Sequence, residues 1–167
     1  MNWNKTSIFL FLISASLWSC FYSFKGVSIP AEIESFSVDF IENNASIVNP
    51  ALSPMITNKL RDQFLRQTKL KMVGENGDYA FSGYISDYQV KAMGSSTTTG
   101  ATQNQLSITV HIKLVSEKAP SNAFETNFTK TESFDASKNL SDVESELIET
   151  ISDNLVQEIF NKSANNW

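Results

Sequence analysis

Between Leu106 and Leu114 every second residue is apolar, and this alternation constrains the fold more than any other pattern in the chain. Ile108, Val110 and Ile112 continue the apolar series, and polar residues stand between them. Successive side chains of a strand point to opposite faces of a sheet. The pattern therefore predicts a strand with one face buried under another layer and the other face in water.

Other segments on both sides of this strand have strand patterns too. Residues 35–41 alternate, and residues 124–134 form a further run with aromatic side chains on one face. Residues 79–93 form a long strand whose apolar phase changes, which predicts a bulge or twist near Ser86-Asp87. Residues 70–73 are a candidate start of the next strand after the first helix. We therefore expect a sheet of about four strands.

Two segments carry apolar residues at helical spacing. The first opens at Asn49-Pro50, an N-cap candidate followed by proline at the first helical position, and runs to about Gln67. The second begins with Ser141-Asp142-Val143-Glu144, the pattern of a capping box. Each helix has one apolar stripe, formed by Leu52, Ile56, Leu60 and Phe64 in the first and by Val143, Leu147, Ile151, Leu155 and Ile159 in the second.

The order of these elements predicts an α+β fold. Strand, helix, two or three antiparallel strands and a second helix follow one another, which we write β-α-β-β-β-α. Two helices with one apolar stripe each would cover one face of a roughly four-stranded, mostly antiparallel sheet. No internal repeat or domain boundary interrupts residues 20–167. We therefore expect a single domain.

The N-terminus has the pattern of a bacterial signal peptide. Residues 1–19 carry one charge, Lys5, which is followed by the apolar run from Ile8 to Ile13. That run is too short to span a bilayer, which takes about 20 apolar residues. We therefore expect residues 1–19 to be removed.

Cys20, the only cysteine, stands at the predicted cleavage site. Leu17 lies three positions before it and Ser19 one before, which is the lipobox arrangement, although Trp18 stands where a small residue is usual. Cleavage would leave Cys20 with a diacylglycerol on its thiol and, in many bacteria, a further acyl chain such as palmitate on its amine. Two acyl chains hold a protein stably on a membrane. The alternatives are a secreted protein with one stray cysteine and an uncleaved signal anchor.

The composition of the mature chain excludes several functions. Cleavage would leave 148 of 167 residues and, because Lys5 is the only charge lost, a net charge of −6 in place of −5. The chain has one cysteine, so it forms no disulfide within the chain. Since it also has only one histidine, it lacks the ligands of a zinc site. An acidic chain also lacks the basic clusters that bind nucleic acid. We expect no metal, no other cofactor and no nucleic-acid partner.

The sequence also argues against an enzyme. The only imidazole, His111, lies in mid-strand among polar neighbours, where a solvated structural role is the simpler interpretation. The carboxylates of the last helix are spaced as a solvent-exposed face. The glycines at 94 and 100 lie between strands and do not open a helix, so they do not form a phosphate loop. The chain is therefore interpreted as a binding or assembly component.

Six short segments match one known family in sequence, order and spacing, although none is diagnostic alone. They are residues 20–30 (CFYSFKGVSIP), 48–53 (VNPALS), 62–70 (DQFLRQTKL), 83–88 (GYISDY), 159–162 (IFNK) and 165–167 (NNW). Together they resemble the LptE family of lipopolysaccharide (LPS) assembly lipoproteins, in the version found in Bacteroidetes. The predicted order of strands and helices is similar to the fold of that family.

The resemblance implies a non-enzymatic function at the outer membrane. Members of the family sit at its periplasmic face, plugged into the β-barrel translocon LptD, where they help the barrel assemble and help deliver LPS to the outer leaflet. The expected partners are therefore an LptD-type barrel, LPS and, through the lipid anchor, the membrane. No acidic cluster follows Cys20. An acidic cluster directly after the lipid-bearing cysteine resembles a signal that sends lipoproteins to the cell surface. Its absence therefore favours a location on the periplasmic side of the outer membrane.

Candidate contact residues follow from charge and flexibility. LPS is polyanionic, so a domain of charge −6 needs a local basic patch to touch it. The basic residues at the end of the first helix could instead pair with the acidic last helix or with the helix dipole. The small polar loop around residues 95–102, the candidate for insertion into the barrel, could simply be disordered. The basic candidates are Lys59, Arg61, Arg66, Lys69, Lys71, Lys91 and Lys113, and the candidate barrel-inserted loop is Ser95, Ser96, Thr97, Thr98 and Thr99.

The sequence is also compatible with a second function. A periplasmic lipoprotein could bind a small amphiphile or another protein independently of any barrel. That function predicts an apolar cavity between the sheet and the helices. The helix stripes consist of large residues, which leave little room for such a cavity, so the sequence favours the barrel plug.

Overall fold

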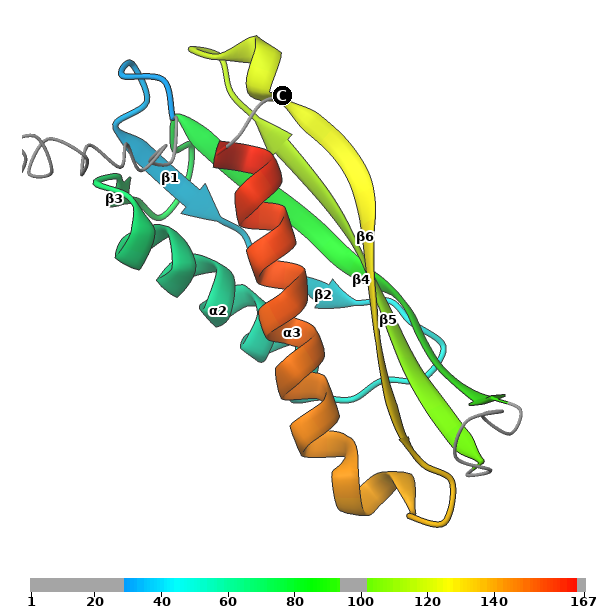
Figure 1. Cartoon of the computed structure of the whole chain (residues 1–167). Coiled ribbons are helices and arrows are strands. Elements are labelled where there is room, and N and C mark those ends of the chain that lie inside the picture. The colour runs from blue at the N-terminus through cyan, green and yellow to red at the C-terminus, as the bar shows by residue number, and fades with distance from the viewer. Residues whose placement is uncertain (1–28, 94–101, 165–167) are drawn as a thin grey trace, which may run out of the picture.

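Two long helices cross one side of a twisted sheet (Figure 1). The computed structural model describes residues 29–93 and 102–164. The elements are, in chain order, β1 (Ser35–Val38), β2 (Glu42–Asn43), α2 (Leu52–Gln67), β3 (Lys71–Met72), β4 (Tyr79–Met93), β5 (Gln103–Val115), the short 3-10 helix η2 (Pro120–Asn122), β6 (Phe124–Asp135) and α3 (Leu140–Ala164).

The sheet is mixed and has six strands, in the order β3-β1-β4-β5-β6, with β2 also beside β4. β4, β5 and β6 are antiparallel, as predicted, but β1 and β2 run parallel to β4, and β3 runs parallel to β1. The expected fold class is therefore confirmed, whereas the prediction of about four mostly antiparallel strands in β-α-β-β-β-α order is wrong. β3 lies within residues 70–73, the candidate start of the next strand, but it is a separate two-residue strand. β2 also has only two residues, too few for an alternation pattern to reveal.

The predicted strand 35–41 is split in the structure. β1 ends at Val38, and Phe40 is 56% exposed, although its alternation with Phe36 and Val38 predicts that it shares their buried face. Ile41 is buried, and β2 then continues along the same edge of β4. The Asp39 N–H still donates to the Phe81 carbonyl at 2.9 Å. The chain thus keeps its backbone pairing with β4 across an interruption that turns Phe40 outward.

β4 contains the predicted irregularity. Ile85 pairs with Val110 and Asp87 with Thr109, so the register shifts across Ser86. An extra residue of this kind reverses the inward and outward alternation of the strand that carries it. The bulge accounts for the burial of both Ile85 and Tyr88, which have opposite parity.

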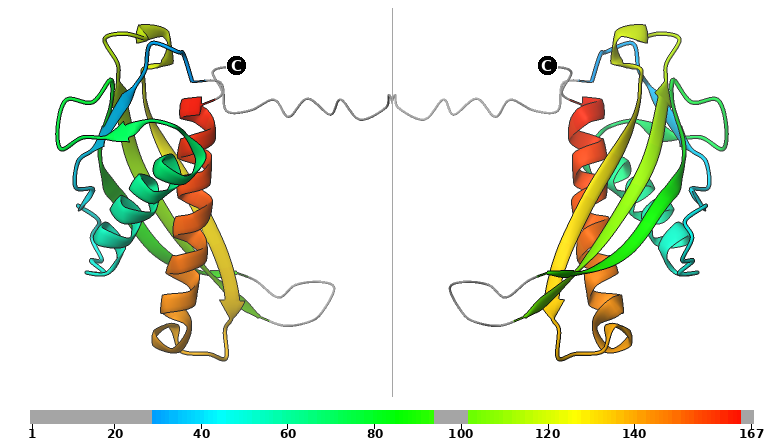
Figure 2. Two further views of the ribbon diagram at one scale, coloured as in Figure 1. Left: turned by 90° about the vertical axis from the view of Figure 1, so that its left-hand side faces the viewer. Right: turned by 90° about the vertical axis from the view of Figure 1, so that its right-hand side faces the viewer.

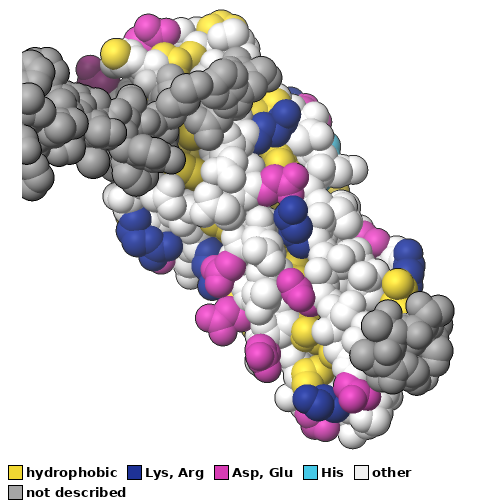
Figure 3. Space-filling model, in the orientation of Figure 1, with side chains coloured by type: hydrophobic (Ala, Val, Ile, Leu, Met, Phe, Trp, Pro, Cys, Tyr) yellow, Lys and Arg dark blue, Asp and Glu magenta, His cyan; other side chains and the backbone are white. Residues whose placement is uncertain are grey.

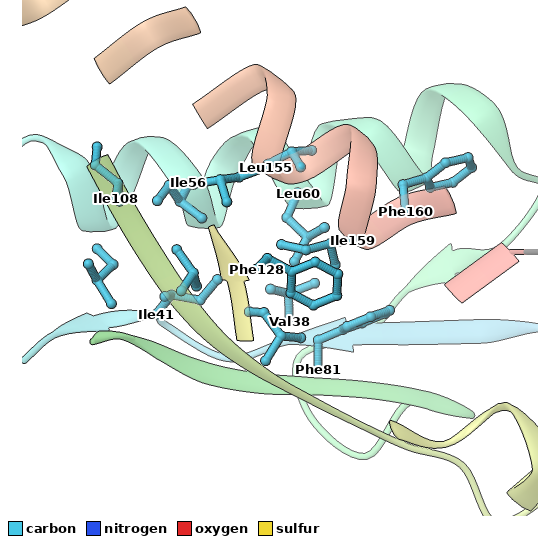
Figure 4. Packing of buried hydrophobic residues seen from close by; sticks show 14 of the residues in the cluster. Val38, Ile41, Ile56, Leu60, Phe81, Ile108, Phe128, Leu155, Ile159 and Phe160 are labelled. Carbon is cyan, nitrogen blue, oxygen red and sulfur yellow. The ribbon is translucent and has the colours of Figure 1, made fainter. Parts of the chain in front are cut away.

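The core lies between the helices and the sheet (Figure 4). The five apolar residues of the β5 alternation are all at most 1% exposed, and so are the four stripe residues of α2. Phe64 of α2 lies at the centre, with its ring centroid 5.3 Å from that of Phe36, 4.9 Å from Phe81 and 5.0 Å from Phe160. One aromatic side chain thus joins α2 to β1, β4 and α3.

The two helices begin differently from expectation. α2 starts at Leu52, and the Asn49 side-chain oxygen accepts the Ala51 N–H at 2.9 Å just before it. α3 starts at Leu140, so the predicted capping box at Ser141 is wrong. The carboxylate of Glu144 instead accepts the Tyr88 hydroxyl at 2.5 Å and the Asn49 side-chain amide at 3.0 Å. Glu144 therefore ties α3 to β4 and to the loop before α2, and it is unavailable to cap its own helix.

Candidate interaction surfaces

The side of the sheet opposite the helices is polar, and neither α2 nor α3 covers it (Figure 2). In β4, β5 and β6, except at the bulge, every second residue faces away from the core. The residues paired with these outward residues on the neighbouring strands face outward too. Threonine, serine, asparagine and glutamine dominate this surface, which we call the outer sheet face. Its members on β5 and β6 are Gln105, Ser107, Thr109, His111, Lys113, Glu125, Asn127, Thr129, Thr131 and Ser133.

Hydrogen bonds hold the centre of the outer sheet face in place. The His111 ring stacks on Tyr84 with centroids 5.0 Å apart, its Nδ1 lies 2.8 Å from Asn127 Oδ1, and its Nε2 lies 3.1 Å from Glu125 Oε1. Lys113 Nζ pairs with the other Glu125 oxygen at 3.1 Å. Lys113 foremost, and His111 beside it, hold the pKa of Glu125 below its ordinary value. Lys113 and Glu125 thus compensate each other's charge, and His111 is held between polar neighbours.

Two of the basic candidates on α2 are engaged within the fold. Lys59 Nζ lies 2.5 Å from Asp153 Oδ1 and 3.9 Å from Glu149 Oε1, both on α3. Arg61 donates from its guanidinium to the Val38 carbonyl at 2.7 Å. Lys59 therefore pairs with the acidic last helix, the alternative that the sequence left open, and Arg61 fastens α2 to the end of β1.

Three other basic candidates form no ion pair or side-chain hydrogen bond within residues 29–93 and 102–164: Arg66, Lys69 and Lys71. They lie at the end of α2 and in β3, beside the point where the described chain begins. Arg66 and Lys69 line a surface groove of about 720 Å³. Its other lining residues are Ile29, Pro30, Ala31, Ile33, Gln67, Thr68 and Leu70.

Of the remaining candidates, the structure describes Lys91. Lys91 is exposed near the end of β4 and makes no ion pair with any described residue. The candidate loop 95–99 lies outside the described residues, as does Cys20. β4 and β5 pair as far as Met93 and Gln103, and these strand ends lie at the opposite end of the sheet from the start of β1 (Figure 1).

One ionic site was missed by the sequence analysis. Asp78, in the turn before β4, accepts the N–H groups of Glu34 and Ser35 at 2.9 and 3.0 Å, and its other oxygen lies 2.8 Å from Lys118 Nζ. Lys118 above all, followed by the Glu34 N–H, holds the pKa of Asp78 well below its ordinary value. These partners are 40 or more positions away from Asp78, so no local pattern could have revealed them.

Neither a metal site nor a membrane span emerges from the described part of the chain. No group of three or more His, Cys, Asp or Glu side chains among residues 29–93 and 102–164 is arranged to hold a metal ion. None of the helices in the same ranges has the length and hydropathy needed to cross a bilayer.

Solved structures with the same fold include two bacterial lipoproteins. A minor lipoprotein from Acinetobacter baumannii matches at a TM-score of 0.54 and 15% identity, over 80% of this chain and 94% of its own. Lipoprotein B from Nitrosomonas europaea matches at a TM-score of 0.52 and 16% identity, over 84% of this chain and 87% of its own. At these identities the likeness concerns the fold alone. A comparison with curated protein sequences finds no significant match.

The family comparison covers most of the described chain. The model of the LptE family, described as lipopolysaccharide-assembly, matches residues 33–163. That range runs from just before β1 almost to the end of α3, so it includes the whole sheet and both helices. The chain therefore belongs to the LptE family of lipopolysaccharide-assembly proteins.

Proposed function

We propose that this protein is an outer-membrane lipoprotein that plugs an LptD-type β-barrel, helps it assemble and supports LPS transport to the outer leaflet. Acylated Cys20 anchors the domain, residues 20–167, at the periplasmic face after removal of residues 1–19. The role is one of binding and assembly, with no reaction and no cofactor. The family match supports the LPS-assembly part of this proposal.

The observation that carries the plug is the uncovered outer sheet face. The lumen of an outer-membrane barrel is polar, so a plug needs a broad surface of hydrogen-bonding side chains with little unpaired charge. The outer sheet face has this chemistry on β5 and β6, where Lys113 pairs with Glu125, His111 hydrogen-bonds with Glu125 and Asn127, and the other members are uncharged. We therefore propose that this face lies against the inner wall of the barrel.

The length of the sheet also supports insertion. β5 has 13 residues, and at about 3.4 Å per residue such a strand spans about 44 Å. The hydrocarbon core of a bilayer is about 30 Å thick. With Cys20 near the membrane at one end, the hairpin around Ser95–Thr99 could reach deep into a barrel, and Lys91 would accompany it as a candidate LPS contact.

Purification of the tagged lipoprotein in mild detergent tests the proposal. We expect an LptD-type barrel to co-purify in near-equal amount, as identified by mass spectrometry. Thr129→Arg on the outer sheet face should reduce the recovered barrel at least about tenfold. Thr150→Arg, a matched change on an exposed threonine of α3, should not. Equal recovery with both variants would remove the outer sheet face from the proposal, and absence of any barrel would remove the plug itself.

The alternative function is the binding of a small amphiphile without a barrel. It calls for a ligand-sized apolar cavity between the sheet and the helices. The space there is occupied by large side chains that are at most 1% exposed, among them Phe36, Phe64, Phe81 and Phe160. Dense packing of this kind favours the plug over an internal ligand site.

A further inference from the structure

The end of the domain nearest to Cys20 carries an unusual pair of properties. Three cations without an ion pair or side-chain hydrogen bond in the described chain stand beside three exposed large apolar side chains, all within nine consecutive residues. Leu65 is 47% exposed, Met72 50% and Val73 38%. We call this surface the α2–β3 corner, and its members are Leu65, Arg66, Lys69, Lys71, Met72 and Val73.

The α2–β3 corner is separate from the charge network of the rest of the domain. The neighbouring cations Lys59 and Arg61 are held by Asp153, Glu149 and a backbone carbonyl, as described above. Figure 3 shows dark blue side chains over the end of α2, apart from the acidic side chains that follow α3. The acids nearest in sequence are Asp62, one helical turn before Arg66, and Glu75, two positions after Val73, and neither forms an ion pair with the three cations in the described chain. The corner therefore presents positive charge although the chain as a whole is acidic.

The start of the described chain fixes where this corner stands. Ile29, Pro30, Ala31 and Ile33 line the same groove as Arg66 and Lys69, and the Lys71 N–H donates to the Glu34 carbonyl at 2.9 Å. Cys20 precedes Ile29 by nine positions. Nine extended residues span at most about 32 Å. An anchor at Cys20 would therefore keep the start of the described chain, and the corner beside it, within about 32 Å of the bilayer surface, which is close to the thickness of one bilayer core.

We propose that the α2–β3 corner docks on the headgroups of an anionic phospholipid leaflet. Cations attracted to the negative surface, with apolar side chains that enter the headgroup boundary, are the combination that binds a protein to an interface. Docking supplies a contact additional to the acyl chains and holds the end of the domain opposite the β4–β5 hairpin at the headgroups, which leaves the hairpin end free to enter a barrel. The orientation rests on the proposed anchor at Cys20, whereas the affinity for anionic lipid does not.

Vesicle binding of the unacylated mature chain tests the affinity. Residues 20–167 with Cys20→Ser are mixed with vesicles of phosphatidylcholine alone, of phosphatidylcholine with phosphatidylglycerol, and of phosphatidylcholine with LPS. We expect partition into the phosphatidylglycerol vesicles, and a loss of about a hundredfold when Arg66, Lys69 and Lys71 are all changed to Gln. The matched control changes Lys130, Lys138 and Lys162, which lie outside both the corner and the outer sheet face, to Gln and should lose less than about threefold. Salt at 0.5 M should abolish the difference.

Three outcomes would overturn the docking proposal. They are equal loss in the two triple variants, equal partition into neutral and anionic vesicles, and binding to the LPS vesicles alone, which would make the corner an LPS site. The circular dichroism and melting temperature of each variant establish that it is folded. None of these measurements involves a barrel. The docking proposal can therefore fail while the plug proposal stands, and the plug proposal can fail while docking stands.

Energy transfer tests the orientation in the acylated protein. A donor dye is placed by Gln67→Cys beside the corner or by Ser137→Cys in the turn before α3, and the acceptor is a headgroup dye in phosphatidylglycerol-containing vesicles. Acylated Cys20 does not react with the dye. We expect stronger transfer from position 67, reduced by the Arg66, Lys69 and Lys71 triple variant. Equal transfer from the two positions would contradict the orientation.

Discussion

Gly83 lies in mid-strand in β4, where its neighbour strand comes unusually close. A Cβ built there would lie 2.2 Å from the His111 carbonyl oxygen, whereas one built at Gly74 would meet nothing within 4 Å. We expect Gly83→Ala to lower the free energy of unfolding by about 1–3 kcal/mol, the usual cost of overpacking. Gly74→Ala should change it by less than about 0.5 kcal/mol. Urea denaturation of both variants measures this, and similar values would contradict the close approach.

A second prediction at the residue scale concerns pH. Asp78 has a pKa below its ordinary value because Lys118 and the Glu34 N–H stabilise its charged form. Its contribution to stability is therefore complete above the pKa of an unfolded aspartate, about 3.9, and is lost as the pH falls below it toward the folded pKa. Between pH 5 and pH 2 the free energy of unfolding of Asp78→Asn should fall less than that of the wild type. Asp39→Asn serves as the control, and chemical denaturation across the pH series is the measurement.

Phe64 is the point at which four elements meet, so it tests the packing of the elements. Its ring contacts those of Phe36, Phe81 and Phe160, and its side chain is fully buried. We expect Phe64→Ala to cost about 3–5 kcal/mol of unfolding free energy. The adjacent Leu65→Ala, at an exposed position, should cost less than about 1 kcal/mol. If urea denaturation gave Phe64→Ala a small effect, the proposed junction would be wrong.

Elements with strong local patterns could be predicted from the sequence. The alternation of β5, the stripes of α2 and α3 and the bulge at Ser86 all follow from side-chain periodicity, and the structure has each of them. The parallel placement of β1, β2 and β3 could not be predicted, because it depends on backbone partners far along the chain. Glu144 illustrates the same limit, since Tyr88 competes with the helix terminus for its carboxylate.

The candidate surfaces were predictable to a similar degree. The basic residues of α2 are visible as a cluster in the sequence, but which of them are engaged depends on distant elements. Lys59 meets Asp153 across 94 positions and Arg61 meets the Val38 carbonyl across 23. The outer sheet face was implicit in the β5 alternation, and its extent became clear only from the pairing of β5 with β4 and β6.

At the scale of the whole molecule, the two ends of the sheet should have separable roles. The pairing of β4 with β5 extends to Met93 and Gln103, so the ladder between these strands is complete outside residues 94–102. Replacing residues 95–99 with two glycines should leave the melting temperature within about 2 °C of the wild type. The same change should lower the recovery of the barrel in detergent. A large loss of stability would show that the loop serves the fold, and unchanged recovery would show that it does not enter the barrel.

The parallel pairing of β1 with β4 has a consequence for how the chain folds during export. Phe36 pairs with Tyr79, so the first strand to emerge must wait for one that follows more than forty residues later. The antiparallel strands β4, β5 and β6 are neighbours in sequence and can form early, whereas contacts between distant segments form slowly. In a chain that emerges N-terminus first, as the proposed export implies, β1 and α2 lack their partner strand until β4 follows. We expect folding to begin with the β4–β6 meander and to finish with the N-terminal segment, the segment that the proposed anchor at Cys20 would hold at the membrane.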